Sequence, residues 1–260
     1  MQKAKEMLTL NAEICKADRD LLKKKHGISK IWNDHYSPAK SIGKCSTLYK
    51  ILKPNSYQDF LQKYLEYAER NKDTLRVIDR GLTEDELILL AQEYKFLCER
   101  QVNINEPLTT YLNDAICHII IETYDGMRRE EEAISIISSR GYRVRKGGDF
   151  LDRRYGVDLA CTDGHGKCFA VQVKPVSFFL SNRIDVTEDR NLIYQKKEKL
   201  KKEKGMETFY MIYDKNVDGR ITWIKNHDDN FAFAFDDALY LGENNNVLVL
   251  KGLLQKIRNK

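Results

Sequence analysis

The spacing of hydrophobic residues changes at Gly141, and this change limits the folds open to the chain. Between residues 56 and 139, apolar side chains recur every three or four positions, as Phe60 and Tyr64 do, which predicts amphipathic helices. After Gly141 apolar and polar residues alternate, which predicts strands. A helical region followed by strands and a later helix is typical of an α/β fold. We expect a mixed central sheet flanked by helices, with a mostly helical amino-terminal region.

Local signals give the approximate bounds of the helices. Thr83 and Glu86 have the spacing of a capping box, so a helix is expected to begin there. Further helices are expected near Leu108, over about 125–140 and over about 192–204, the last of them rich in lysine. In the first 50 residues, the basic segments 23–27 and 36–40 suggest loops between short elements.

The predicted strands follow the helix that ends at Gly141. Residues 163–166, with the sequence Asp-Gly-His-Gly, provide turn chemistry, so the strands on either side of them should form a hairpin. The predicted strands cover residues 142–145, 156–162, 167–177, 208–213 and 220–224.

Length and composition set the broad class. The 260 residues suffice for one large domain or two smaller ones, and 42% hydrophobic content excludes a disordered chain. We expect a helical region over 1–120 and a region holding the sheet over 121–260, or one continuous domain. No apolar stretch approaches the roughly 18 residues of a membrane span. Six scattered cysteines without a Cys-x-x-Cys pair favour a soluble, reduced, cytoplasmic protein.

One group of polar residues lies on the predicted hairpin. Alternation places Gln172 and Lys174 on the same face of their strand, and Asp158 on the neighbouring strand can converge on them. Upstream, Glu130 lies on the helix that ends before Gly141. Because acidic residues occupy 130, 131 and 132, at most two of the three face inward.

This order of elements resembles the PD-(D/E)xK nuclease superfamily: a helix with Glu, a strand, a strand with Asp, a strand with an acidic residue or Gln before x-Lys, and a helix. The resemblance covers about residues 125–213. More narrowly, Gly156-Val157-Asp158 with Gln172-Val173-Lys174 is similar to the MjaI-type type II restriction endonucleases. The resemblance implies a restriction-endonuclease-like fold. It also implies that the region before residue 121 serves DNA recognition and dimerisation.

The resemblance also implies a metal site and a role for each residue. Mg²⁺ would bind Asp158, the side-chain oxygen of Gln172 and the main-chain carbonyl of Val173, because this ion prefers oxygen ligands and keeps several waters. Lys174 would orient the attacking water or help to deprotonate it. Gln172 departs from the usual acidic residue, as it does in the Mrr-like type IV enzymes. It removes one negative charge, which Glu130 would offset.

Double-stranded DNA is the expected partner, although a net charge of +5 permits a polyanion without requiring one. Lys196, Lys197 and Lys201 follow the hairpin and could bind phosphates, but the same lysines also suit a solvated helix face. Near the amino terminus, Lys40 and Lys44 are candidates for groove contacts.

The expected function is therefore that of a type II restriction enzyme. A homodimer would cut a short palindrome, beside a DNA methyltransferase that protects the same site. Three alternatives stay open: an Mrr-like modification-dependent nuclease, a repair nuclease, and a non-catalytic DNA-binding module that keeps this fold.

Overall fold

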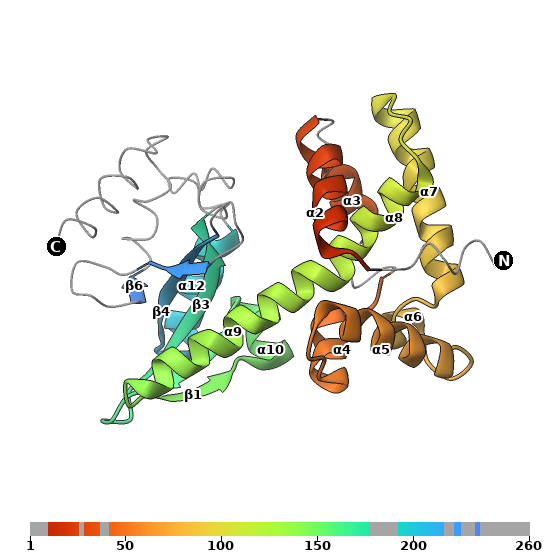
Figure 1. Cartoon of the computed structure of the whole chain (residues 1–260). Coiled ribbons are helices and arrows are strands. Elements are labelled where there is room, and N and C mark those ends of the chain that lie inside the picture. The colour runs from red at the N-terminus through yellow and green to blue at the C-terminus, as the bar shows by residue number, and fades with distance from the viewer. Residues whose placement is uncertain are drawn as a thin grey trace. The chain divides into compact units, whose positions relative to one another are not determined.

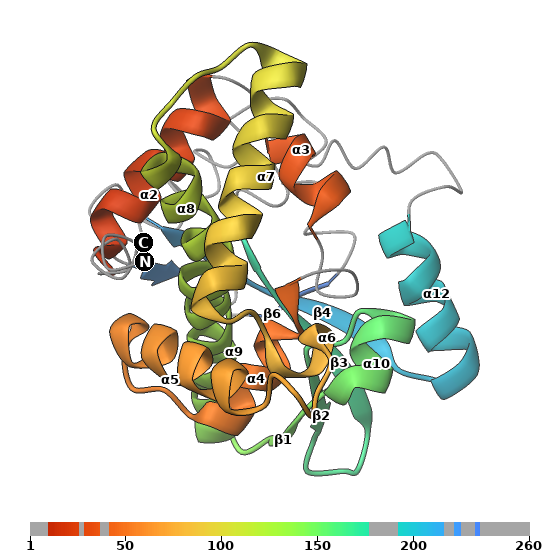
Figure 2. The same ribbon diagram turned by 90° about the vertical axis from the view of Figure 1, so that its right-hand side faces the viewer.

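The computed structural model describes residues 10–25, 29–36, 42–176, 192–215, 221–224 and 232–234. The chain divides into two compact units, Met1–Arg128 and Arg129–Lys260. Figures 1 and 2 show the described elements from two sides. No described helix is long and apolar enough to cross a bilayer.

The described part of the first unit is helical. The helix over residues 12–20 continues into a π-helical turn that includes residues 23–25, where a loop was expected, so this expectation was wrong. Residues 26–27 and 37–40 of the two expected loops lie outside the described residues. The helices are α2 (Ala12–Asp20), η1 (Leu21–Lys25), α3 (Ser29–His35), α4 (Cys45–Leu52), α5 (Tyr57–Arg70), α6 (Val77–Arg80), α7 (Glu84–Val102), α8 (Leu108–Ile116) and η3 (Cys117–Ile121).

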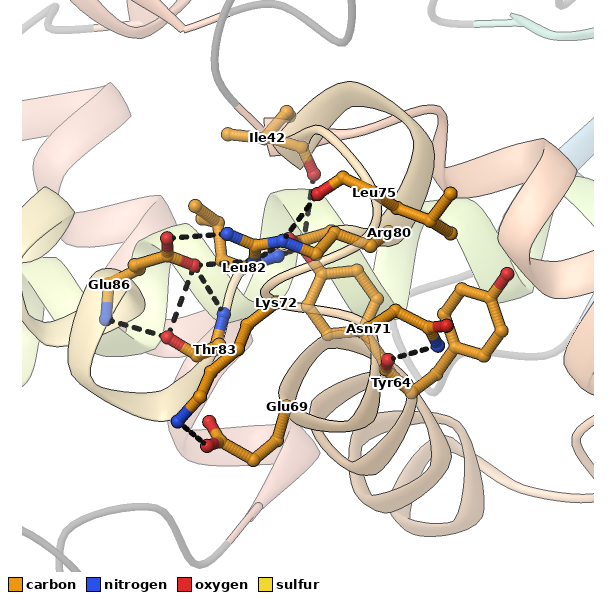
Figure 3. Close-up of polar contacts among 12 residues, drawn as sticks. Ile42, Tyr64, Glu69, Asn71, Lys72, Leu75, Arg80, Leu82, Thr83 and Glu86 are labelled. Carbon is orange, nitrogen blue, oxygen red and sulfur yellow. Dashed lines mark hydrogen bonds and ion pairs between the residues drawn. The ribbon is translucent and has the colours of Figure 1, made fainter.

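The core of this unit is rich in aromatic side chains. Phe60, Tyr64, Tyr94 and Tyr111 are fully buried. The Tyr64 hydroxyl donates to the carbonyl of Ile42 at 3.0 Å and accepts from the Leu82 amide at 2.8 Å, as Figure 3 shows. A buried tyrosine needs such partners because an unpaired hydroxyl inside a core is costly.

The start of α7 confirms the predicted capping box. The Thr83 hydroxyl accepts from the Glu86 amide, and the Glu86 carboxylate accepts from the Thr83 amide. Arg80, which is buried, adds two hydrogen bonds from its guanidinium to the same carboxylate, at 2.7 and 2.8 Å (Figure 3). The spacing of Thr83 and Glu86 predicted the cap but gave no sign of the arginine.

In the second unit, a mixed sheet lies between helices, which confirms the expected α/β class. The strands are β1 (Arg143–Lys146), β2 (Leu159–Thr162), β3 (Cys168–Pro175), β4 (Glu207–Lys215), β5 (Ile221–Trp223) and β6 (Ala232–Ala234). Their order is β1-β2-β3-β4-β5, and β6 also pairs with β4. The β3–β4 pair is parallel and the other pairs are antiparallel. The hairpin of β2 and β3 was predicted correctly.

Helices cover both faces of this sheet. Ala133 and Ile137 of α9 (Glu122–Ser139) pack against Leu159, Val171 and other residues of one face. On the other face, α10 (Gly148–Tyr155) and α12 (Leu192–Lys204) pack together against β3, with Leu200 and Tyr155 in the cluster (Figure 2).

In this unit the predicted bounds are correct for one helix and wrong for one strand. The helix over residues 192–204 has the predicted bounds. The strand expected from residue 156 begins only at Leu159, because α10 ends at Gly156 in a left-handed conformation with φ of 68°. Glycine adopts this conformation without the steric cost that other residues carry. The short helix α10 itself was not predicted.

Candidate active site

The candidate site lies where β2 and β3 separate. Their pairing ends at Leu159 and Val171, so Asp158 stands just before β2 and opposite Gln172 on β3. The main chain is held there, because the amide of Gly147 donates to the Asp158 carbonyl at 2.7 Å. A Cβ on Gly147 would lie 2.0 Å from the carbonyl oxygen of Val157, so only glycine fits this approach.

Asp158 and Lys174 meet directly. One carboxylate oxygen of Asp158, Oδ2, accepts from the Val173 amide at 2.7 Å and from the Lys174 ammonium at 3.1 Å. Both side chains are largely buried, with 13% and 24% of their surfaces exposed. The prediction that these two residues converge across the hairpin is therefore confirmed.

The Val173 main chain faces the same point. In an extended strand, the N–H and C=O of one residue point toward the same edge. Since the Val173 amide donates to Asp158, its carbonyl also points to the edge beside Asp158. The carbonyl thus lies where a cation bound by Asp158 could reach it.

Gln172 and Lys196 lie close to Gly156. A Cβ added to Gly156 would be 3.1 Å from Nε2 of Gln172 and 3.6 Å from Cδ of Lys196. Gln172 is buried, and the side chain of Lys196 comes to Gly156 from α12. Among the predicted phosphate-binding lysines that the structure describes, Lys196 is the one whose side chain lies near Gly156, two residues before Asp158.

Tyr210 was not singled out from the sequence but belongs to this group. It pairs with Gln172 across the parallel β3–β4 ladder and is buried. Burial raises the pKa of its hydroxyl, and the nearby charge of Asp158 raises that pKa further. The phenol therefore stays neutral beside the carboxylate. Its place on β4, two residues into a predicted strand, was the only signal available.

Glu130 has a different neighbour. Its carboxylate lies 4.0 Å from the ammonium of Lys146, which is paired with Leu159 and so shares the sheet face covered by α9. Alternation along the strands assigns Gln172 and Lys174 to the opposite face. The role predicted for Glu130 at the metal site stays a prediction. Glu131 also approaches Lys146, at 3.9 Å.

The other predicted DNA-contacting lysines form ion pairs. Lys197 lies 3.9 Å from Glu198, and Lys201 lies 3.0 Å from Glu207. In the first unit, Lys44 lies 3.8 Å from Asp79. Lys40 is outside the described residues. The pairs of Lys201 and Lys44 are partly exposed, and such surface pairs contribute little, so these two lysines can exchange their partners for phosphates. The Lys197 side chain is only 12% exposed.

The donors at this site are oxygens, which are the ligands that Mg²⁺ prefers. Among the described residues, no cluster of three or more His, Cys, Asp or Glu side chains could hold an ion. The candidate ligands are Oδ1 of Asp158, the carbonyl of Val173, whose amide donates to the other Asp158 oxygen, and the side-chain oxygen of Gln172, which stands opposite Asp158. One carboxylate with neutral oxygens fits Mg²⁺, which keeps several waters, and does not fit a zinc site.

Comparisons of the chain with family models, with curated proteins and with solved structures gave no match.

Proposed function

We propose that this chain is a Mg²⁺-dependent endonuclease that cleaves double-stranded DNA. The observation that carries the proposal is the junction of Asp158, the Val173 main chain and Lys174 where β2 and β3 separate. The order of elements also supports it: α9, the antiparallel strands β1, β2 and β3, the crossover helix α12 and the parallel strand β4. This order is similar to the restriction-endonuclease-like core.

Each residue has a role in the proposed reaction. Oδ1 of Asp158, the Val173 carbonyl and Gln172 would hold Mg²⁺, which when bound offsets phosphate charge and acidifies water. Lys174 orients the attacking water and offsets charge on the phosphate. As the new phosphorus–oxygen bond forms, the bond to the leaving backbone oxygen breaks, and the proton of the water ends on that leaving oxygen. Lys196 binds the phosphate oxygens from α12.

The finer proposal is a type II restriction enzyme. It would act as a homodimer on a short palindrome in the cytoplasm, with a methyltransferase protecting the same site. A modification-dependent or repair nuclease would use the same junction on other DNA.

A non-catalytic DNA-binding module is the second candidate, and one observation favours it. Within the described residues, Asp158 belongs to no group of three or more His, Cys, Asp or Glu side chains that could hold a metal ion, and Lys174 pairs with it at 3.1 Å. A site with one carboxylate and two lysines can bind phosphate without cutting it.

Digestion of unmethylated phage DNA with Mg²⁺ separates these possibilities. The native protein is compared with Lys174→Ala and with Lys167→Ala, a matched control on the exposed hairpin turn of the same unit. Lys174→Ala should lower the cleavage rate by at least about 100-fold while duplex binding is kept. Discrete bands from the native protein and the control support a restriction enzyme.

The remaining outcomes decide against parts of the proposal. A smear would retain the nuclease and refute sequence-specific restriction. Cleavage that survives in Lys174→Ala would refute the assigned site. Binding without cleavage of unmethylated, methylated and branched DNA would favour the DNA-binding module.

A further inference from the structure

The outer face of α7 carries apolar side chains that the rest of its unit does not cover. Leu89 is 61% exposed and Phe96 is 54% exposed. The opposite side of α7 packs on α8 and α3, with Leu90 and Tyr94 buried (Figure 1). Two large apolar side chains seven residues apart share one face of a helix.

Charged residues lie at both ends of this face. Asp85 is four residues before Leu89, and Arg100 is four residues after Phe96, so all four align along the helix. The guanidinium of Arg100 lies over the Phe96 ring, 5.4 Å from its centroid. Within the described part of the chain, the ion pairs of α7 use Glu86, Lys95 and Glu99, and neither Asp85 nor Arg100 joins one.

The four positions are symmetric about one point. Leu89 and Phe96 lie equally far from the midpoint between Gln92 and Glu93, and so do Asp85 and Arg100. Two copies of α7 packed antiparallel about a twofold axis at this midpoint therefore place Leu89 against Phe96 of the partner subunit. The same axis brings Asp85 to the level of the partner's Arg100. A twofold interface requires such self-complementarity.

We propose that this face of α7 is the surface through which two copies of the chain associate. We infer that the partner is a second copy rather than an unrelated protein. When two copies of the face meet antiparallel, apolar residues lie against apolar residues and each acidic residue lies against a basic one. A helix of 19 residues is roughly 28 Å long, so the contact is small. At the twofold axis, Glu93 of one copy also lies beside Glu93 of the other, and their like charges repel. A reversible, micromolar dimer is therefore expected.

The test measures mass and does not depend on nuclease activity, so it can fail or succeed independently of the proposed function. Sedimentation velocity on the full chain, over about 1 to 200 µM, should show a monomer–dimer equilibrium. Phe96→Ser should raise the dimer Kd by at least about tenfold. Phe150→Ser is the matched control, since Phe150 is also exposed and has Arg154 over its ring at 5.8 Å.

Charge reversal tests the twofold geometry itself. Asp85→Arg alone or Arg100→Asp alone should each raise the Kd about two- to thirtyfold, because like charges then meet twice per dimer. The double variant should return the Kd to near the native value, since both new pairs attract. Thermal melting of each variant checks that the chain is folded.

Three results would overturn the proposal. The first is a monomer at every concentration, which leaves this face to DNA or to another partner. The second is a dimer that Phe96→Ser does not weaken. The third is a double charge variant that stays as weak as the single ones.

Discussion

Replacing Glu86 by Gln should destabilise the first unit through the buried arginine that it faces. The Arg80 guanidinium donates to both Glu86 oxygens, at 2.7 and 2.8 Å, and is itself only 6% exposed (Figure 3). The Thr83 amide donates to the same carboxylate at 2.8 Å. Gln keeps the shape of the side chain but removes the charge that offsets Arg80.

The pKa of Glu86 sets the size of this effect. Chiefly the hydrogen bonds from Arg80, helped by Thr83 and opposed by burial, lower that pKa from 4.5 to about 2. A difference of this size corresponds to about 3.4 kcal/mol. Because 34% of the side chain is exposed, solvent screening reduces the expected loss of unfolding free energy to about 2 kcal/mol. The melting temperature should fall by about 5–10 °C.

The contribution of Glu86 to the free energy of unfolding should depend on pH in a definite direction. A carboxyl group with a lowered pKa in the folded state stabilises the protein above its unfolded pKa, and loses this contribution as pH falls toward the folded pKa. The gap between native and Glu86→Gln proteins should be full at pH 7 and should shrink below about pH 4.5.

Urea titrations at pH 7, 4.5 and 3.5 measure this gap. Glu84→Gln is the control, because it removes a charge from the same first turn of α7. A loss below about 0.5 kcal/mol at pH 7, or a gap that does not change with pH, would refute the reasoning.

Three further predictions follow from burial and close contacts. Gly147→Ala should prevent the second unit from folding, whereas Gly164→Ala, with open space around it, should not; circular dichroism and melting curves compare the two. A thiol reagent at pH 8 should react quickly with one of the six cysteines, the exposed Cys168. The other five are buried, and burial raises the pKa of their thiols to about 11 or 12. Fast reaction of two or more cysteines would contradict this burial. Tyr94→Phe should cost about 1–3 kcal/mol of unfolding free energy, because buried Asp114 loses a 2.8 Å hydrogen bond; an unchanged urea midpoint would show that the bond contributes nothing.

The sequence by itself determined the features that depend on neighbouring residues. The capping box of Thr83 and Glu86, the hairpin turn at residues 163–166 and the lysine-rich helix 192–204 all follow from local hydrogen bonding or from hydrophobic spacing. The alternation within β3 also placed Gln172 and Lys174 on one face. These were predicted because their interactions join residues close in the chain.

The tertiary structure alone decided the features that join distant residues. The Tyr64 hydroxyl reaches the Ile42 carbonyl, 22 positions earlier in the chain, only through the packing of the first unit. Lys196 reaches Gly156 only because α12 crosses over the sheet. The register likewise turned Lys146 toward Glu130 and left Asp158 with Lys174. Such contacts depend on packing between elements. A short sequence pattern does not determine which face of a helix or strand a neighbouring element will cover.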